Sequence, residues 1–127
     1  MLRRIVTALL LPAVAIGQDL AQPLRAVPFP QVRIADPFFA PRRATNRKVT
    51  LRHALAQLES SGTLPNFDRA ARGERTGYEG YVFQDSDAYK VLEAIAYALA
   101  EDRDAELEAK FDAVVARIAA AQQPDGY

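Results

Sequence analysis

Apolar residues recur at the three-to-four-residue spacing of an amphipathic helix in three stretches of the chain. The first stretch covers residues 45–60, the second covers residues 86–100, and the third runs from about residue 104 until Pro124 ends it. The pattern therefore predicts an all-α fold for this part of the chain. The positions expected to face a core are Leu51, Leu55 and Leu58, then Leu92, Ile95, Ala96 and Leu99, and finally Leu107, Phe111, Val114, Val115 and Ile118.

Polar and turn-forming residues mark the ends of these helices. Gly62 is a suitable C-terminal stop for the first helix. Asp85 or Ser86 is expected to cap the second helix, with Asp87 in its first turn, where the helix dipole favours a negative charge. A tight connection follows, and Asp104 or a neighbour caps the third helix. The short connection and the complementary apolar stripes predict that the second and third helices pair antiparallel as an αα-hairpin.

The rest of the chain after the leader lacks a helical period. Residues 18–30 form a tether punctuated by prolines, and residues 31–39 alternate apolar and polar positions, which predicts a short strand or an extended arm laid across something larger. Pro37 and Pro41 limit such a strand to the edge of a sheet. Residues 62–80 are interrupted by proline and glycine and are expected to form a long loop, which in a compact domain is usually functional or disordered.

The chain begins with the layout of a secretory signal, which we assign to residues 1–17. Arg3 and Arg4 form its charged region, and a nearly unbroken apolar run follows. Signal peptidase would cut before Gln18 or, alternatively, before Ile16. The run is too short for a comfortable membrane span, which needs about 20 apolar residues, and an uncleaved N-terminal anchor is the alternative interpretation. We expect an exported protein, periplasmic or secreted, with no stable membrane association after cleavage.

Charge and cysteine content narrow the class of protein further. The chain carries 16 basic and 16 acidic residues, and removing the two arginines of the leader leaves 14 basic against 16 acidic. A slight acidic surplus argues against a nucleic-acid partner, which would favour a basic surface. Since the chain has no cysteine, it has neither a disulfide framework nor a lipoprotein anchor, and packing alone must stabilise it.

The densest polar chemistry lies at the start of the second predicted helix, in Gln84, Asp85, Asp87, Lys90 and Glu93. Paired carboxylates are the arrangement that glycoside hydrolysis needs. However, Lys90 is three residues from both Asp87 and Glu93, so it can bridge the two acids on one helix face. A cap followed by a ladder of ion pairs is therefore the favoured interpretation, with Glu93 partly buried at the border of the apolar stripe.

Two further polar residues follow the third helix. Gln122 continues the face of Phe111, Val115 and Ile118, so its amide is expected to point toward the core. A buried amide must be hydrogen-bonded, and it would either bond a neighbouring helix end or line a polar cavity. Asp125 precedes a glycine and is expected to form a turn rather than to act as a catalyst.

The aromatic residues near the long loop have two interpretations. Asn66-Phe67 and the tyrosines Tyr78 and Tyr81 can stack against sugar rings, but such residues more often attach a loop to its domain. The only histidine, His53, falls on the polar side of its helix and is expected to be exposed. A lone histidine makes no metal site.

Four groups of residues, taken in order, resemble a known family. They are Val-Arg-Ile-Ala-Asp-Pro-Phe-Phe at residues 32–39, Asn-Phe at residues 66–67, the stretch at residues 81–94, and Ala-Gln-Gln-Pro-Asp-Gly-Tyr at residues 121–127. The third group is the specific one, because Gln-Asp-Ser-Asp is followed there by tyrosine, lysine and glutamate. In these motifs the chain resembles the beginning of glycoside hydrolase family 127, typified by β-L-arabinofuranosidases.

The resemblance implies a catalytic domain built as an (α/α)6 barrel and followed by β-sandwich domains. It also implies retaining hydrolysis by a cysteine nucleophile bound to zinc in a cysteine-and-glutamate cluster, with a glutamate as acid/base. No catalytic residue and no metal ligand carries over to this chain, which lacks cysteine. Zinc is thus implied for the full-length family member and no cofactor for this chain.

We interpret residues 1–17 as a signal peptide, residues 18–40 as a linker and extended arm, and residues 41–127 as the N-terminal part of a truncated helical-barrel domain. The parent would hydrolyse non-reducing-end sugars, foremost L-arabinofuranose, of plant-type glycans. The fragment alone is expected to be inactive and either to be unstable or to aggregate, because its apolar faces lack partners. The alternatives are a free-standing secreted helical carbohydrate-binding module and another helical-toroid sugar hydrolase. Candidate substrate contacts are Gln84, Asp85, Asp87, Gln122 and Asp125, and the pattern gives no oligomeric state.

Overall fold

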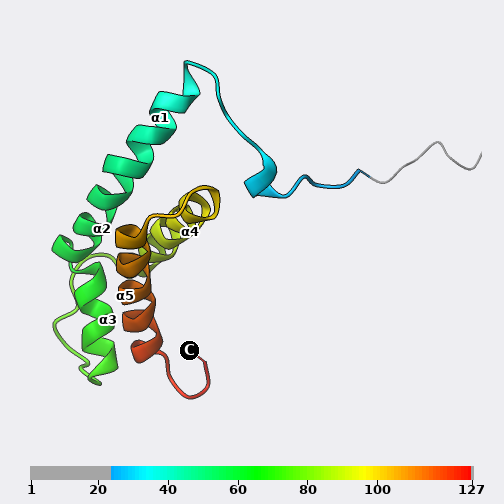
Figure 1. Cartoon of the computed structure of the whole chain (residues 1–127). Helices are drawn as coiled ribbons and strands as arrows, with labels where there is room; N and C mark the ends of the chain where they lie inside the picture. Colours follow the sequence, from blue (N-terminus) through cyan, green and yellow to red (C-terminus); the bar gives the residue numbers. More distant parts are fainter. Residues whose placement is uncertain (1–23, 127) are drawn as a thin grey trace, which may run out of the picture.

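The computed structural model describes residues 24–126, so the predicted signal peptide, the start of the tether and Tyr127 lie outside the described residues. Every regular element within residues 24–126 is helical and none is a strand, which confirms the all-α class (Figure 1). The (α/α)6 barrel stays a prediction. In chain order the elements are η1 (Phe29–Gln31), α1 (Phe39–Thr45), η2 (Asn46–Thr50), α2 (Leu51–Ser60), α3 (Thr63–Ala71), α4 (Asp85–Glu101) and α5 (Ala105–Ala121).

The first helical segment begins at Phe39, well before the predicted start near Thr45. The Asp36 carboxylate accepts hydrogen bonds from the backbone N–H groups of Phe38 and Phe39 at 2.9 and 2.7 Å, which satisfies donors that a helix start leaves open. Pro41 is tolerated because it lies in the first turn. Only residues 32–36 remain as an extended arm, and they pair in no strand.

A π-helical turn, η2, joins α1 to α2 without a break in the helical path. The backbone N–H of Leu51 donates to the carbonyl of Asn46, five residues earlier. Such a turn holds one residue more than an α-helical turn. As a result, α1 is rotated relative to α2 about the helix axis, compared with an uninterrupted α-helix.

The predicted loop over residues 62–80 is wrong in its first half, which forms α3. Gly62 does stop α2, with the left-handed φ of 83° that favours glycine. Pro65 does not prevent the next helix because it lies in the first turn, where its missing N–H has no helical partner. The irregular segment is therefore confined to residues 72–84.

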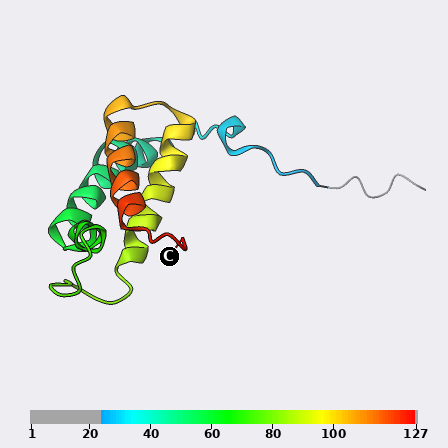
Figure 2. The same ribbon diagram turned by 90° about the horizontal axis from the view of Figure 1, so that it is seen from below.

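Helices α4 and α5 confirm the predicted αα-hairpin, since the chain runs along α4 and returns along α5 in Figure 2. The Asp104 side chain caps α5 by accepting from the N–H of Leu107 at 3.0 Å, as predicted. The predicted cap of α4 is wrong. Gln84 occupies the cap position without a side-chain cap bond, and Asp85 is instead the first residue of the helix.

The core is formed where α2, α3, α4 and α5 meet. Two predicted core residues, Ala96 and Val115, are exposed because no described element covers their side of the hairpin, whereas Leu99, Phe111 and Ile118 are partly buried. No helix within residues 24–126 is both long enough and apolar enough to cross a membrane. The buried apolar residues are Leu51, Leu55, Leu58, Leu64, Ala88, Leu92, Ile95, Leu107 and Val114.

The helices form a bundle with two distinct ends (Figure 2). We call one the loop end; it contains the start of α3, residues 72–84, the first turn of α4 and the turn at residues 122–126. We call the other the arm end; it contains η1 and the arm, α1, η2, the last turn of α4 and the first turn of α5. All five candidate substrate-contact residues of the sequence prediction belong to the loop end.

Candidate functional site

Gln84 links three segments of the loop end. Its Nε2 donates to the Thr63 hydroxyl at 2.8 Å and to the Ser61 carbonyl at 3.1 Å, and its Oε1 accepts from the N–H of Tyr81 at 3.1 Å. Both amide hydrogens are therefore used within the protein. Gln84 fixes the start of α4 against the turn between α2 and α3, which is a structural role at the site rather than a free contact for substrate.

This linkage requires glycine at two positions. A Cβ atom on Gly80 would lie 1.8 Å from Oε1 of Gln84, and a Cβ atom on Gly62 would lie 2.7 Å from Cβ of Glu79. Both glycines also have a left-handed φ, at 88° and 83°. At Gly62 and Gly80 the backbone therefore packs against neighbouring residues so closely that a side chain would clash.

Asn66 attaches the loop to α3 through a reciprocal pair of hydrogen bonds. Its Nδ2 donates to the Glu79 carbonyl at 2.8 Å, and its Oδ1 accepts from the Glu79 N–H at 3.1 Å. Arg69 reinforces the contact by donating to Oδ1 of Asn66 at 3.0 Å and by pairing with the Glu79 carboxylate at 2.6 Å. The sequence marks Asn66 only as part of a motif, and its partner lies 13 residues away.

The aromatic residues of the loop end divide between packing and exposure. Phe67 is partly buried and meets Tyr89 edge-to-face at 6.2 Å, so it fits the packing interpretation. Tyr81 and Phe83 stack on each other at 5.5 Å with 73% and 65% of their surfaces exposed. Tyr78 donates to the Tyr81 carbonyl at 2.5 Å and is 51% exposed. These three rings remain available to a ligand.

The predicted ladder of ion pairs is only half present. Lys90 pairs with Asp87 at 2.9 Å and contacts the Ser86 hydroxyl at 3.3 Å, as its spacing predicts. No ion pair joins Lys90 to Glu93 in the part of the chain that the structure describes, and Glu93 is exposed rather than partly buried. Asp85 accepts from the N–H of Ser86 at 3.0 Å through Oδ1. These acids lie at the surface of the first turns of α4.

The prediction that the Gln122 amide is buried toward the core is wrong. Since α5 ends at Ala121, the Gln122 side chain leaves the helical face and is exposed, and its Nε2 donates to the Gly126 carbonyl at 2.8 Å. Asp125 lies in a turn closed by a 2.8 Å bond from the Gly126 N–H to the Gln123 carbonyl, which confirms the turn prediction. Gln122 and Asp125 therefore form the border of the loop end.

Two neighbouring hollows lie at this end and share Phe67 as a common wall. The first, which we call the loop-end pocket, has a volume of about 220 Å³. The second has a volume of about 360 Å³ and is mainly apolar. The loop-end pocket is lined by Thr63, Asn66, Phe67, Ala70, Tyr78, Val82 and Asp85. The second hollow is lined by Phe67, Tyr89, Val115, Ile118, Ala119, Ala121, Gln122 and Gly126.

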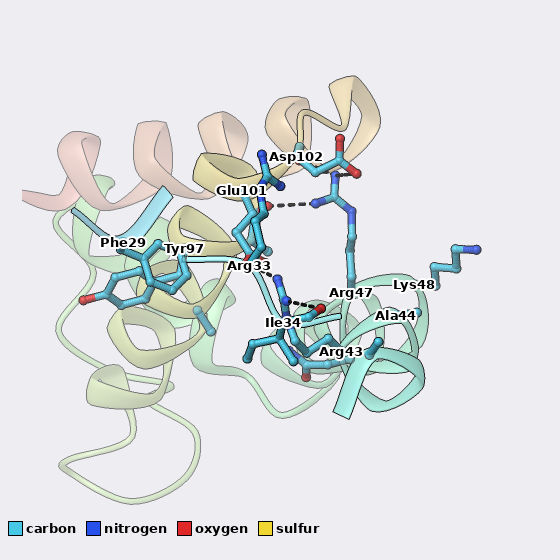
Figure 3. Close-up of a pocket in the computed structure, with 14 residues that line it drawn as sticks. Phe29, Arg33, Ile34, Arg43, Ala44, Arg47, Lys48, Tyr97, Glu101 and Asp102 are labelled. Atoms are coloured by element: carbon cyan, nitrogen blue, oxygen red, sulfur yellow. Dashed lines mark hydrogen bonds and ion pairs between the residues drawn. The ribbon is translucent and has the colours of Figure 1, made fainter. Parts of the chain in front are cut away.

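A larger cleft of about 500 Å³ lies at the arm end (Figure 3). The Phe29 ring meets Tyr97 edge-to-face at 5.1 Å, so η1 forms one side of the cleft. Arg43 pairs with Glu101, and Arg47 donates to the carbonyls of Ala98, at 2.8 Å, and Asp102. These arginines already bond partners across the cleft. We therefore interpret the cleft as the packing contact between η1, α1 and η2 on one side and the last turn of α4 on the other.

Ion pairs also determine the pKa values of several carboxylates. The Arg117 guanidinium bonds Asp68 at 2.8 and 2.5 Å, which lowers the pKa of Asp68, and the bonds to Asp68 and Glu59 raise the pKa of Arg117. At the arm end a hydrogen bond from Arg52 and another from the Leu107 N–H lower the pKa of Asp104. These groups connect helices and lie outside both loop-end hollows.

The residues present do not fit the zinc cluster that the family resemblance implies. The chain has no cysteine, and residues 24–126 bring together no group of three histidine, cysteine or acidic side chains that could hold a metal ion. His53 is exposed, as predicted. No step of a reaction can therefore be derived through a metal on these residues.

Comparison with known proteins agrees with the motifs and the fold. Residues 31–127 match the profile of the family described as β-L-arabinofuranosidase, GH127 catalytic domain. The chain belongs to this family. It is 60% identical over 76 residues to the non-reducing end β-L-arabinofuranosidase of Bifidobacterium longum subsp. longum, covering 59% of this chain and 10% of that protein. A solved GH127 β-arabinofuranosidase superposes with a TM-score of 0.74 at 37% identity, covering 80% of this chain and 16% of that one.

Proposed function

We propose that this chain forms part of the catalytic domain of a retaining β-L-arabinofuranosidase that acts on non-reducing-end sugars of plant-type glycans. The observation that carries the proposal is the family match over residues 31–127, supported by the 60% identity to a non-reducing end β-L-arabinofuranosidase. The chain spans about a tenth of that relative's length. Its contribution would therefore be to shape one wall of the substrate site, with the bond-breaking groups supplied elsewhere.

We place the proposed wall of the substrate site at the loop end. Its exposed rings, its carboxylates and its two hollows lie together, whereas the cleft of the arm end is spanned by bonded arginines. Concave, mostly apolar sites with a few polar groups are the usual form of small-molecule sites. The loop end thus supplies the surface that would face a sugar.

The experiment is a comparison of two products. One is encoded by the whole reading frame, and the other is the 127-residue chain; both are assayed on an aryl β-L-arabinofuranoside and on its α anomer, with and without a zinc chelator. We expect the longer product to cleave only the β substrate and to lose activity with chelator, while the 127-residue chain is inactive. Cleavage of the β substrate by the short chain, or none by the long product, would contradict the proposal.

A free-standing carbohydrate-binding module is the second candidate, because Tyr78, Tyr81 and Phe83 are exposed on one loop. Two results together would support the binding module: the 127-residue chain sediments with insoluble arabinan, and the longer product hydrolyses no arabinofuranoside. Another helical-toroid sugar hydrolase is the third, and activity of the long product on unsaturated oligosaccharides alone would favour it.

We also propose export through residues 1–17, on the strength of the charged and apolar pattern there. Fractionation of the native host would locate the protein, and N-terminal sequencing of the exported form should begin at Gln18 or Ile16. Retention in the cytoplasm with an intact N-terminus would overturn export.

A further inference from the structure

The loop-end pocket has the composition of a site for a small neutral ligand. Two aromatic residues, Phe67 and Tyr78, line it together with the aliphatic Val82 and Ala70. Asp85 is the only residue with a formal charge among those that line it. A single carboxylate is too little for a divalent cation, which takes several oxygen ligands, and it would repel an anionic ligand.

The polar groups of the pocket are not equally available. Asn66 and Thr63 already bond Glu79 and Gln84, so they act as fixed walls. Asp85 uses Oδ1 for the Ser86 N–H, and its second oxygen accepts no hydrogen bond from the described residues. One acceptor beside aromatic and aliphatic walls matches a sugar ring, which presents hydroxyl donors at its edge and C–H groups on its faces.

Size and rigidity support the same ligand class. At about 220 Å³ the pocket is smaller than the roughly 300–1,000 Å³ of drug-sized sites, so it suits one ring rather than an oligosaccharide. Tyr78 is held by its bond to the Tyr81 carbonyl, and its loop is held by Asn66 and Gln84. A wall fixed before binding loses less conformational freedom when the ligand arrives.

We propose that the loop-end pocket is a subsite for one neutral sugar ring of the glycan substrate. Phe67 and Tyr78 form its apolar walls, and the free oxygen of Asp85 accepts hydrogen bonds from ring hydroxyls. The inference rests on the proposed function for the nature of the substrate, and it adds the residues of this chain that contact it. The Asp85 charge favours a neutral ring over a uronic acid, because it repels a second carboxylate.

The test uses the whole enzyme with Tyr78→Ala, Tyr78→Phe and Asp85→Asn. Tyr97→Ala is the matched control, because Tyr97 is 51% exposed like Tyr78 but lies at the arm end. For each variant, KM and kcat are measured on an arabinofuranosyl disaccharide, and binding of L-arabinose and galacturonic acid is followed by saturation-transfer NMR. Circular dichroism checks that each variant is folded.

We expect Tyr78→Ala and Asp85→Asn to raise KM by roughly tenfold each, with kcat changed less than about twofold. Tyr78→Phe should keep most of the wild-type KM because the ring remains, and Tyr97→Ala should match the wild type. L-arabinose should show binding that Tyr78→Ala weakens, and galacturonic acid should bind more weakly than L-arabinose.

Two results separate the subsite from the proposed function. If the wild type cleaves the disaccharide but Tyr78→Ala and Asp85→Asn keep its KM, the subsite is wrong and the function stands. If the wild type cleaves no arabinofuranoside yet binds a neutral sugar in a Tyr78-dependent way, the subsite stands and the function is wrong. Absence of both activity and Tyr78-dependent binding overturns both.

Discussion

The arm end and the loop end are held together by different chemistry. At the arm end, arginines reach across elements: Arg47 donates to carbonyls in the last turn of α4, and Arg52 bonds Asp104 at 2.8 Å. Cations at a helix C-terminus satisfy carbonyls that the helix leaves open. At the loop end, the neutral amides of Asn66 and Gln84 make most of the hydrogen bonds between elements, and one ion pair, between Arg69 and Glu79, lies beside them.

The difference determines which side chains at each end are already paired. At the arm end the carboxylates of Glu101 and Asp104 are already paired, with Arg43 and Arg52. Amides instead join backbone groups and leave neighbouring carboxylates and rings facing outward, as with Asp85 and Tyr81. A region assembled through amides and glycines can thus be rigid and still present unused acceptors.

The largest expected effect tests whether the two ends share one core. Ile95 is fully buried in the middle of α4, so Ile95→Ala should lower the free energy of unfolding by about 2–5 kcal/mol. Urea unfolding followed by circular dichroism and by tyrosine fluorescence should give one shifted transition for both probes. Val115→Ala, at a residue 41% exposed, is the control and should cost much less. Two separate transitions in the wild type would mean that the ends are independent units.

A smaller effect isolates the close approach at the loop end. Gly80 and Gly73 both have a left-handed φ, but only at Gly80 would a Cβ atom meet another residue. Left-handed strain costs each alanine variant about 1–3 kcal/mol, and Gly80→Ala should lose more because it displaces the Gln84 amide. Thermal unfolding of both variants measures the difference. Equal losses would show that Gln84 does not fix the loop.

Acid should weaken the contact between α3 and α5 through Asp68. Arg117 lowers the pKa of Asp68 in the folded protein below the ordinary value of 3.8, so the unfolded chain takes up the proton first as the pH falls. The stabilisation, about 1 kcal/mol after solvent screening, is complete well above pH 3.8 and is lost as the pH falls through the lowered pKa. Asp68→Asn should therefore flatten the decline in stability between pH 5 and pH 2 in urea titrations, and an unchanged slope would contradict the pairing.

The smallest effect distinguishes the two ends by their response to salt. Arg52→Met removes a charged contact of the arm end, and Gln84→Ala removes the neutral contacts of Gln84 at the loop end. Arg52→Met should lower the unfolding midpoint. Because 1 M salt shortens the screening length to about 3 Å, this decrease should be smaller in 1 M salt than in low salt. The loss through Gln84→Ala should stay constant. If salt reduces the effect of both variants on the unfolding midpoint equally, the two ends do not differ in the charge of their contacts.

The sequence predicts the long periodic helices of this fold well and the segments around prolines poorly. Helices α4 and α5 and the Asp104 cap follow from periodicity and spacing that involve only neighbouring residues. Helix α3 and the start of α1 were missed because Pro65 and Pro41 suggest breaks, although a proline in the first turn removes no helical hydrogen bond.

The sequence indicates where the candidate residues cluster but not how they are bonded. The motif at residues 84–87 lies at the loop end, together with Gln122 and Asp125, and the neighbouring Lys90 pairs with Asp87 as its spacing predicts. The bonds from Gln84 to Ser61 and Thr63 span more than 20 residues, and no local pattern encodes such contacts. Gln122 failed for the opposite reason, since the helix that would have buried it ends one residue earlier.

The π-helical turn η2 sets the rotational phase between α1 and α2. An α-helix turns by about 100° per residue, so the one additional residue in this turn rotates everything before it relative to everything after it. With Leu51, Leu55 and Leu58 fixed in the core, that offset directs Arg43 and Arg47 toward the last turn of α4. Deleting one residue from Asn46–Thr50 would rotate α1 by about 100° relative to α2 and turn Arg43 away from Glu101. The register of a single turn thereby determines whether α1 contacts the end of α4.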